Sequence, residues 1–107
     1  MGLNQYEIVL VNLDPTIGSE MKKTRPAVII SPNEMNKYLN TIVIAPVTST
    51  SKPYPTRAAI KHAKAKGWVD LDQVRTIDRK RIVKKLGSLA EKEITKVKAI
   101  LKETFVD

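Results

Sequence analysis

The fold class is decided by residues 26–45, PAVIISPNEMNKYLNTIVIA. Two apolar runs, residues 26–30 and 41–45, are built almost entirely from aliphatic side chains, which is typical of strands buried on both faces. The polar residues 31–36 between them contain Pro32 and can hold a helical turn. This segment therefore predicts two neighbouring buried strands joined by a short helical connection.

Strand patterns continue on both sides of this segment. Residues 6–13 are rich in β-branched side chains and are followed by Asp14-Pro15, where proline cannot donate to a sheet ladder. The remaining expected strands are residues 56–60, 68–77 and 82–86, separated by a loop at 48–55 and a basic turn at 61–67. So many short strands predict a compact, mostly antiparallel β-barrel.

The last segment predicts an amphipathic helix that packs on this barrel. Its apolar residues recur at helical spacing, with lysines between them: Ile94, Val97, Leu101 and Phe105. Ser88 followed by Glu91 matches a capping box, which satisfies free N–H groups at a helix start. We therefore expect a mainly β (α+β) fold, a small antiparallel barrel of about five to seven strands with a short internal helix and a C-terminal helix.

Length and composition predict a single domain spanning residues 1–107. The chain is 42% hydrophobic and 28% charged, which is an ordinary globular balance, and no apolar stretch is long enough to span a membrane. It contains no cysteine, which excludes disulfides and thiolate chemistry. The first residues show neither a basic nor an apolar leader pattern, so we expect a cytoplasmic protein.

The charge balance predicts an anionic partner. Nineteen Lys and Arg against 11 Asp and Glu give a formal net charge of +8. Most of this surplus lies in residues 61–107, so we expect the polyanion to bind near the second half of the chain. A soluble surface enriched in lysine is the alternative explanation.

A long polar loop between the first two expected strands is the first candidate for function. It runs over about a dozen residues, whereas most hairpin connections are much shorter. The loop ends at Arg25-Pro26, and the proline biases Arg25 towards an extended conformation at the start of a strand. On local pattern alone, an ordinary surface loop with a solvated arginine remains an equal alternative.

Several segments resemble the motifs of the MazF/PemK toxin family, in the order and spacing of that family. These segments are residues 12–15 (NLDP), 18–20 (GSE), 23–29 (KTRPAVI), 44–49 (IAPVTS) and 71–78 (LDQVRTID). The resemblance covers nearly the whole chain. Two departures, at residues 4–7 and at Ala90, lie outside the matched functional positions.

The resemblance implies the toxin of a type II toxin–antitoxin system, a sequence-specific endoribonuclease (mRNA interferase). Such an enzyme cleaves single-stranded RNA without a metal, by attack of the ribose 2'-hydroxyl on the adjacent phosphate. The products are a 2',3'-cyclic phosphate and a free 5'-hydroxyl. The resemblance also implies an SH3-like barrel topology, a two-fold homodimer with a shared basic groove, and an antitoxin whose flexible acidic tail occupies that groove.

By similarity, Arg25 and Thr48 occupy the catalytic positions of the family. Ser19, Glu20, Asp72 and Gln73 match positions that line the RNA site. The Arg25 guanidinium can grip two phosphate oxygens, which suits transition-state stabilisation better than a role as an acid. The Thr48 hydroxyl can bond a phosphate oxygen, orient the 2'-hydroxyl or bond its own backbone.

The general base stays open at this stage. Asp72 and Glu20 are rival candidates, and either carboxylate can instead pair with a nearby cation. His62 is the only histidine and sits among lysines, so we interpret it as a solvated bystander. We interpret Trp68 as a core or interface residue rather than a base-stacking platform.

Metal and phosphate-loop chemistry have little support in the sequence. One histidine, no cysteine and scattered carboxylates provide no ligand set at a recognisable spacing, so we expect no cofactor. Two alternatives remain: a DNA gyrase inhibitor of the CcdB type on the same fold, and a catalytically inactive RNA-binding module. The cleaved base sequence and the antitoxin cannot be read from the chain.

Overall fold

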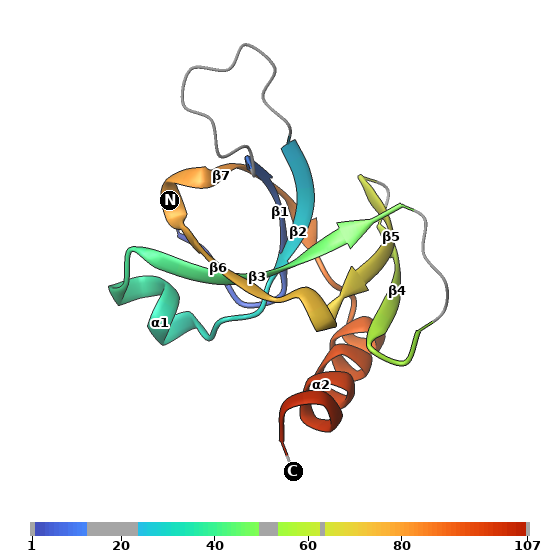
Figure 1. The fold of residues 1–107 in the computed structure, drawn as a ribbon. Coiled ribbons are helices and arrows are strands. Elements are labelled where there is room, and N and C mark those ends of the chain that lie inside the picture. The colour runs from blue at the N-terminus through green and yellow to red at the C-terminus, as the bar shows by residue number, and fades with distance from the viewer. Residues whose placement is uncertain (1, 13–23, 50–53, 63, 107) are drawn as a thin grey trace.

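One strongly curled antiparallel sheet forms the centre of the protein (Figure 1). The structure is a computed structural model and describes residues 2–12, 24–49, 54–62 and 64–106. The strands are β1 (Glu7–Asn12), β2 (Thr24–Ile29), β3 (Thr41–Thr48), β4 (Arg57–His62), β5 (Ala65–Asp70), β6 (Arg75–Asp78) and β7 (Ile82–Ser88). The helices are α1 (Asn33–Tyr38) and α2 (Glu91–Phe105), with short 3-10 turns η1 (Leu71–Gln73) and η2 (Arg79–Arg81). The predicted fold class is confirmed by this half-barrel with its C-terminal helix.

Strand β3 organises the sheet because it has different partners along its length. The sheet order is β4-β5-β3-β2-β1-β7, and β6 pairs with the first half of β3. On the side away from β2, β6 pairs with β3 from Thr41 to Ile44, and β5 pairs with Val47 and Thr48. Pro46 lies between these two ladders, where its missing N–H interrupts neither.

The central parts of β1, β2 and β3 are buried on both faces of the sheet, which explains their continuous apolar sequence. One cluster lies inside the curl of the sheet and includes Val9, Ile29 and Ile42. The other cluster, which includes Ile8 and Val28, packs against α2. Neighbouring residues of one strand therefore enter different cores.

Helix α2 confirms the predicted C-terminal helix but begins differently. Ala90 is the residue before its first turn, and the Ala90 N–H donates to Glu93 Oε1 at 2.9 Å. The predicted capping box at Ser88 and Glu91 is wrong, because Ser88 belongs to β7. Of the predicted apolar face, Phe105 is exposed.

Two boundaries differ from the sequence-based expectation. The predicted basic turn at 61–67 is instead a tight hairpin, in which His62 pairs with Ala65 and Ile60 with Gly67. The predicted strand at 68–77 is broken by η1, because Leu71 turns into the core and its N–H donates to Thr56 O at 3.0 Å. The expected helical turn after Ser31 is confirmed by α1.

Candidate active site

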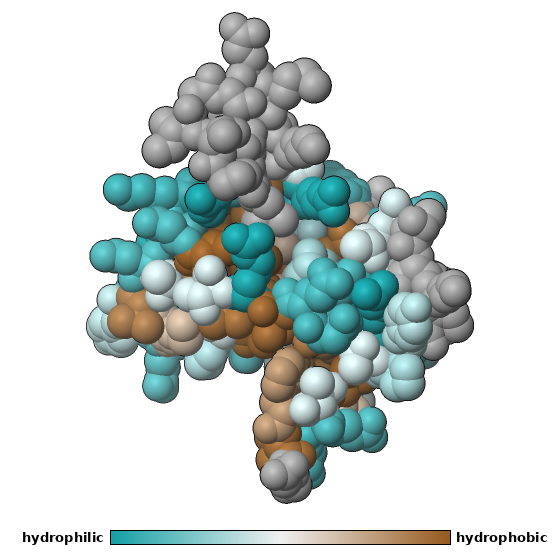
Figure 2. Space-filling view, viewed as in Figure 1, coloured by the Kyte–Doolittle hydropathy of each residue, from teal (hydrophilic) through white to brown (hydrophobic). Residues whose placement is uncertain are grey.

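A hollow of about 410 Å³ lies where β2 begins and β3 ends. Its lining combines two cations, two hydroxyls and an apolar wall: Arg25, Pro26, Val47, Thr48, Ser49 and Lys66. Both residues that the sequence matched to catalytic positions therefore face the same space. On the face shown in Figure 2, hydrophilic side chains lie around the end of the barrel where β2 begins, and apolar atoms reach the surface over the curled sheet as well as along α2.

The register of β2 and β3 explains this meeting of residues far apart in the sequence. The two strands run antiparallel, with Ala27 opposite Pro46. Continuing this register towards the start of β2 brings Arg25 next to the end of β3, where Thr48 lies. Arg25 is exposed and Thr48 is half-buried, so the guanidinium reaches solvent while the hydroxyl is held in the wall.

Lys66 is a functional candidate that sequence reasoning missed. It lies on β5, opposite Lys61 of β4, and its exposed side chain lines the hollow beside Thr48. The sequence signal was the basic run before Gly67, which we interpreted as a solvated turn. Two cations in one hollow attract a phosphate group, and attraction of this kind weakens as salt is added.

The Thr48 hydroxyl is tied to a buried carboxylate. Thr48 Oγ1 donates to Asp70 Oδ1 at 3.2 Å, and the Arg57 Nε atom approaches the same oxygen at 3.3 Å. Asp70 is only 1% exposed. Arg57 also approaches Asp72 Oδ1 at 3.4 Å and stacks on Tyr54, 5.0 Å from the ring centroid.

The two neighbouring carboxyls differ in their pKa shifts. Burial raises the pKa of Asp70 above its ordinary value, although the charge of Arg57 and the hydrogen bond from Thr48 oppose this shift. For Asp72, partial burial also acts to raise the pKa, but hydrogen bonds from Arg57, its own backbone and Thr56 outweigh it and lower the pKa. Asp72 is therefore engaged in an ion pair, a poor state for a proton acceptor.

The predicted RNA-contacting residues are placed differently. Asp72 and Gln73 lie on η1, are exposed and do not line the hollow. Ser19 and Glu20 fall outside the described residues. All four assignments stay predictions.

Two further interpretations concern the ring side chains of Trp68 and His62. Trp68 pairs with Thr48 across β3 and β5 and is half-buried. The placement of His62 on a solvated loop is wrong, because His62 ends β4 and is half-buried. A Cβ atom on Gly87 would lie 2.3 Å from His62 Nε2, so the imidazole packs directly on the β7 backbone.

Gly67 holds the wall of the hollow in place, and its substitution by alanine should damage the site. Its φ angle is +148°, and a Cβ atom there would lie 2.1 Å from the backbone oxygen of Thr48. We expect Gly67→Ala to lower the free energy of unfolding by roughly 1–3 kcal/mol, because β3 and β5 must separate or the backbone must strain. Urea unfolding measures this change.

Gly2→Ala is the matched control for this glycine. A Cβ atom at Gly2 has no neighbour within 4 Å, so the same chemical change should leave stability within about 0.5 kcal/mol of the unsubstituted protein. Equal unfolding curves for Gly67→Ala and Gly2→Ala would contradict the close approach of Gly67 to Thr48.

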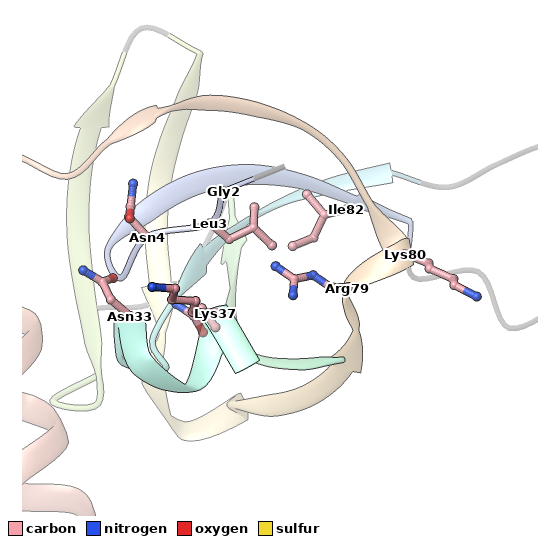
Figure 3. A pocket seen from close by; sticks show the side chains of 9 residues that line it. Gly2, Leu3, Asn4, Asn33, Lys37, Arg79, Lys80 and Ile82 are labelled. Atoms are coloured by element: carbon pink, nitrogen blue, oxygen red, sulfur yellow. The ribbon is translucent and has the colours of Figure 1, made fainter. Parts of the chain in front are cut away.

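A larger hollow of about 710 Å³ lies at the opposite end of β3, beside α1 and η2 (Figure 3). Its polar side chains hold the backbone together: Asn33 Oδ1 accepts from the Gln5 N–H at 2.7 Å, and Arg79 donates to Leu39 O at 3.1 Å. Asn36 is bonded to Ser31. The smaller hollow is therefore the better candidate for chemistry.

The described part of the chain shows neither a metal-binding cluster nor a membrane-spanning helix. Among residues 2–12, 24–49, 54–62 and 64–106, no group of three His, Asp or Glu side chains is placed to hold a metal ion. No helix there is long and apolar enough to cross a membrane.

Comparison with known proteins identifies the relatives of this half-barrel. A family model described as a PemK-like, MazF-like toxin of type II toxin–antitoxin systems matches residues 4–105. The endoribonuclease MazF of Staphylococcus epidermidis is 36% identical over 101 residues, which cover 89% of this chain and 84% of that protein. The endoribonuclease MazF of Staphylococcus saprophyticus is 35% identical with the same coverage.

Solved structures agree with the sequence comparison. MazF from Deinococcus radiodurans matches with a TM-score of 0.80 and 27% identity, covering 96% of each chain. A MazE–MazF structure from the same organism matches with a TM-score of 0.82 and 27% identity, covering 96% of this chain and 95% of that chain. The curled half-barrel with its C-terminal helix therefore places the protein in the structural class of these MazF chains. Within that class, the chain belongs to the PemK/MazF family of type II toxins.

Proposed function

We propose that this MazF-type endoribonuclease cleaves single-stranded messenger RNA at a specific sequence, without a metal, and leaves 2',3'-cyclic phosphate and 5'-hydroxyl ends. The observation that carries the proposal is the placement of Arg25 and Thr48 in one cationic hollow. The names of the curated relatives support the reaction class. Messenger RNA as substrate places the proposed action in the cytoplasm.

The reaction asks little of the protein beyond position and charge. RNA carries its own nucleophile, so the site must hold the phosphate, orient the 2'-hydroxyl and stabilise the charge that develops on the phosphorane. Arg25 supplies a planar pair of donors for two phosphate oxygens, and Lys66 adds a second positive charge nearby. A guanidinium keeps its charge in proteins, so we assign Arg25 the role of electrostatic stabiliser rather than proton donor.

Four further residues are proposed to bind the RNA on either side of the cut. Ser19, Glu20, Asp72 and Gln73 are the proposed contacts, through their resemblance to family positions. Single-stranded RNA can present unstacked bases to such residues, which allows sequence recognition. A two-fold homodimer would place two sets of these residues beside one shared groove.

An antitoxin is the proposed protein partner. The MazE–MazF structures from Deinococcus radiodurans pair a similar chain with MazE. We propose that this chain likewise binds a cognate antitoxin, through a flexible acidic tail attracted by the net charge of +8.

The proposal is tested by incubating the purified protein with a long single-stranded RNA in excess EDTA and sequencing the 5'-hydroxyl ends. We expect cuts at one short sequence, at the same rate with and without EDTA, because no step is assigned to a metal. Intact RNA, with protein shown to be folded and free of antitoxin, would contradict the proposal. A gyrase–DNA cleavage assay on the same sample then distinguishes a CcdB-type inhibitor from an inactive RNA-binding module.

A further inference from the structure

Asp70 is buried with partners among the described residues, Thr48 and Arg57, on only one of its two carboxyl oxygens, Oδ1. It immediately precedes η1, yet its side chain makes no capping hydrogen bond there. Its Oδ2 atom is buried and accepts no hydrogen bond from the described residues. Burying a carboxyl with one oxygen unsatisfied is costly, so its retention in the wall of the hollow calls for an explanation.

Strand geometry points this carboxyl at Thr48. Trp68 pairs with Thr48, and Asp70 lies two residues further along β5, so both residues of β5 face the same side as Thr48. The hydrogen bond from Thr48 Oγ1 to Asp70 Oδ1 measures 3.2 Å. Arg57 of β4 pairs with Asp70 and contacts the same Oδ1 atom, which fixes the carboxyl from the other strand.

We propose that Asp70 is a positioning residue that holds the hydroxyl hydrogen of Thr48 inside the wall, so that Thr48 acts on RNA only as a hydrogen-bond acceptor. This inference rests on the proposed ribonuclease function. A threonine hydroxyl has one hydrogen and two lone pairs. Because its hydrogen is given to Asp70, Thr48 turns lone pairs towards the hollow.

An acceptor at Thr48 selects one partner on the substrate. The non-bridging phosphate oxygens are acceptors and cannot bond to a lone pair, whereas the ribose 2'-hydroxyl is a donor. Thr48 therefore orients the 2'-hydroxyl, the nucleophile of the reaction, and leaves the phosphate oxygens to Arg25 and Lys66. Of the roles that the sequence leaves open for Thr48, only orientation of the 2'-hydroxyl is kept.

The role requires an accepting oxygen at Oδ1 but no negative charge. Burial raises the pKa of Asp70, and a proton on the unpartnered Oδ2 would leave Oδ1 able to accept from Thr48. Asparagine places a carbonyl oxygen in the same position, whereas leucine has a similar shape and no acceptor. These two variants separate positioning from packing and from charge.

The kinetic test compares Asp70→Asn and Asp70→Leu on an RNA that contains the mapped cleavage site. We expect Asp70→Leu to lower kcat about tenfold or more with KM within about twofold, because the nucleophile is bound but poorly oriented. Asp70→Asn should recover most of this loss. An unchanged kcat in Asp70→Leu, or an equal loss in both variants, would overturn the inference.

A binding test measures the contact between Thr48 and the 2'-position of the RNA without catalysis. It does not require full activity of a variant. RNA with a single 2'-deoxy nucleotide at the cleaved position cannot react and lacks the donor. The unsubstituted protein should bind 2'-deoxy RNA and 2'-fluoro RNA with equal affinity, because neither group can donate a hydrogen bond. It should bind 2'-deoxy RNA about threefold more weakly than 2'-amino RNA, because the amino group donates.

In Asp70→Leu the preference for the 2'-amino RNA should disappear, and in Asp70→Asn it should remain. If Asp70→Leu still prefers the 2'-amino RNA, the inference is overturned. Binding can be measured at a temperature where this variant is folded, even if the variant is less stable than the unsubstituted protein. Failure of the proposed function is seen separately, as an absence of cleavage by the unsubstituted protein.

Discussion

Arg25→Ala should lower kcat for RNA cleavage by at least about a hundredfold, the largest effect expected of any single substitution in this chain. Arg25 lines the hollow together with Thr48 and Lys66. Removing one preorganised donor from a charged transition state costs about 10²–10³ in kcat in comparable sites. Its side chain is exposed, so the free energy of unfolding should change by less than about 0.5 kcal/mol. Single-turnover cleavage and urea unfolding measure the two quantities.

Two further arginine variants make this result specific. Arg25→Lys keeps the charge but loses the planar pair of donors, so its kcat should lie between the kcat of Arg25→Ala and that of the unsubstituted protein. Arg79→Ala removes the same charge at the opposite end of β3, in the larger hollow, and should weaken RNA binding slightly without lowering kcat. Equal kcat values for Arg25→Ala and Arg79→Ala would show that net charge alone explains the effect.

Thr48→Val should lower kcat by about tenfold to a hundredfold and leave strand β3 folded. Valine has nearly the shape of threonine and is favoured in strands, so the substitution removes only the hydroxyl. The protein then loses the proposed acceptor for the 2'-hydroxyl and the hydrogen bond to Asp70 Oδ1. The latter loss should cost about 1 kcal/mol of stability. Thermal unfolding separates this cost from the loss of rate.

Thr48→Ser is the control because it restores the hydroxyl at the cost of one methyl group. We expect its kcat to lie within about threefold of the unsubstituted protein, since the serine Oγ can donate to Asp70 in the same way. Serine at the neighbouring position 49 is exposed and also lines the hollow, so Ser49→Ala tests whether any hydroxyl nearby suffices. Cleavage by Thr48→Val at the unsubstituted rate would remove Thr48 from the mechanism.

The core strands could be predicted because their signal is local. Residues 26–30 and 41–45 are continuous apolar runs, and a strand buried on both faces needs no other pattern. The hairpin from His62 to Ala65 could not be predicted in the same way. Its side chains are short or basic, and its strands are specified by pairing with β3 and with each other rather than by a hydrophobic pattern.

Helix α2 shows the same division between pattern and context. Its apolar spacing predicted the helix, but its first residue was misplaced by the Ser88–Glu91 motif. Ser88 remains in β7 because it pairs with Glu7 of β1. The Leu89 N–H then donates to Tyr6 O at 3.0 Å, which carries the chain past the strand before the helix can begin. A sheet partner outweighed the local capping signal.

For the site, sequence resemblance located Arg25 and Thr48, while the residues that surround them belong to no motif that marks them as functional. In the sequence, Asp70 is an ordinary polar residue before a family motif, and Lys66 is one lysine in a basic run. The ladder between β3 and β5 places both residues beside Thr48.

The sequence by itself determined the mainly β class, the buried strands, the terminal helix, the family and the two residues that we propose as catalytic. These depend on hydrophobic periodicity and on motifs, which are contained in short stretches of chain. Only the tertiary structure decided which side chains meet in the hollow, which carboxyl is buried and which way the Thr48 hydroxyl donates. Such contacts depend on strand register, and a shift of one residue would turn every side chain of a strand to the other face.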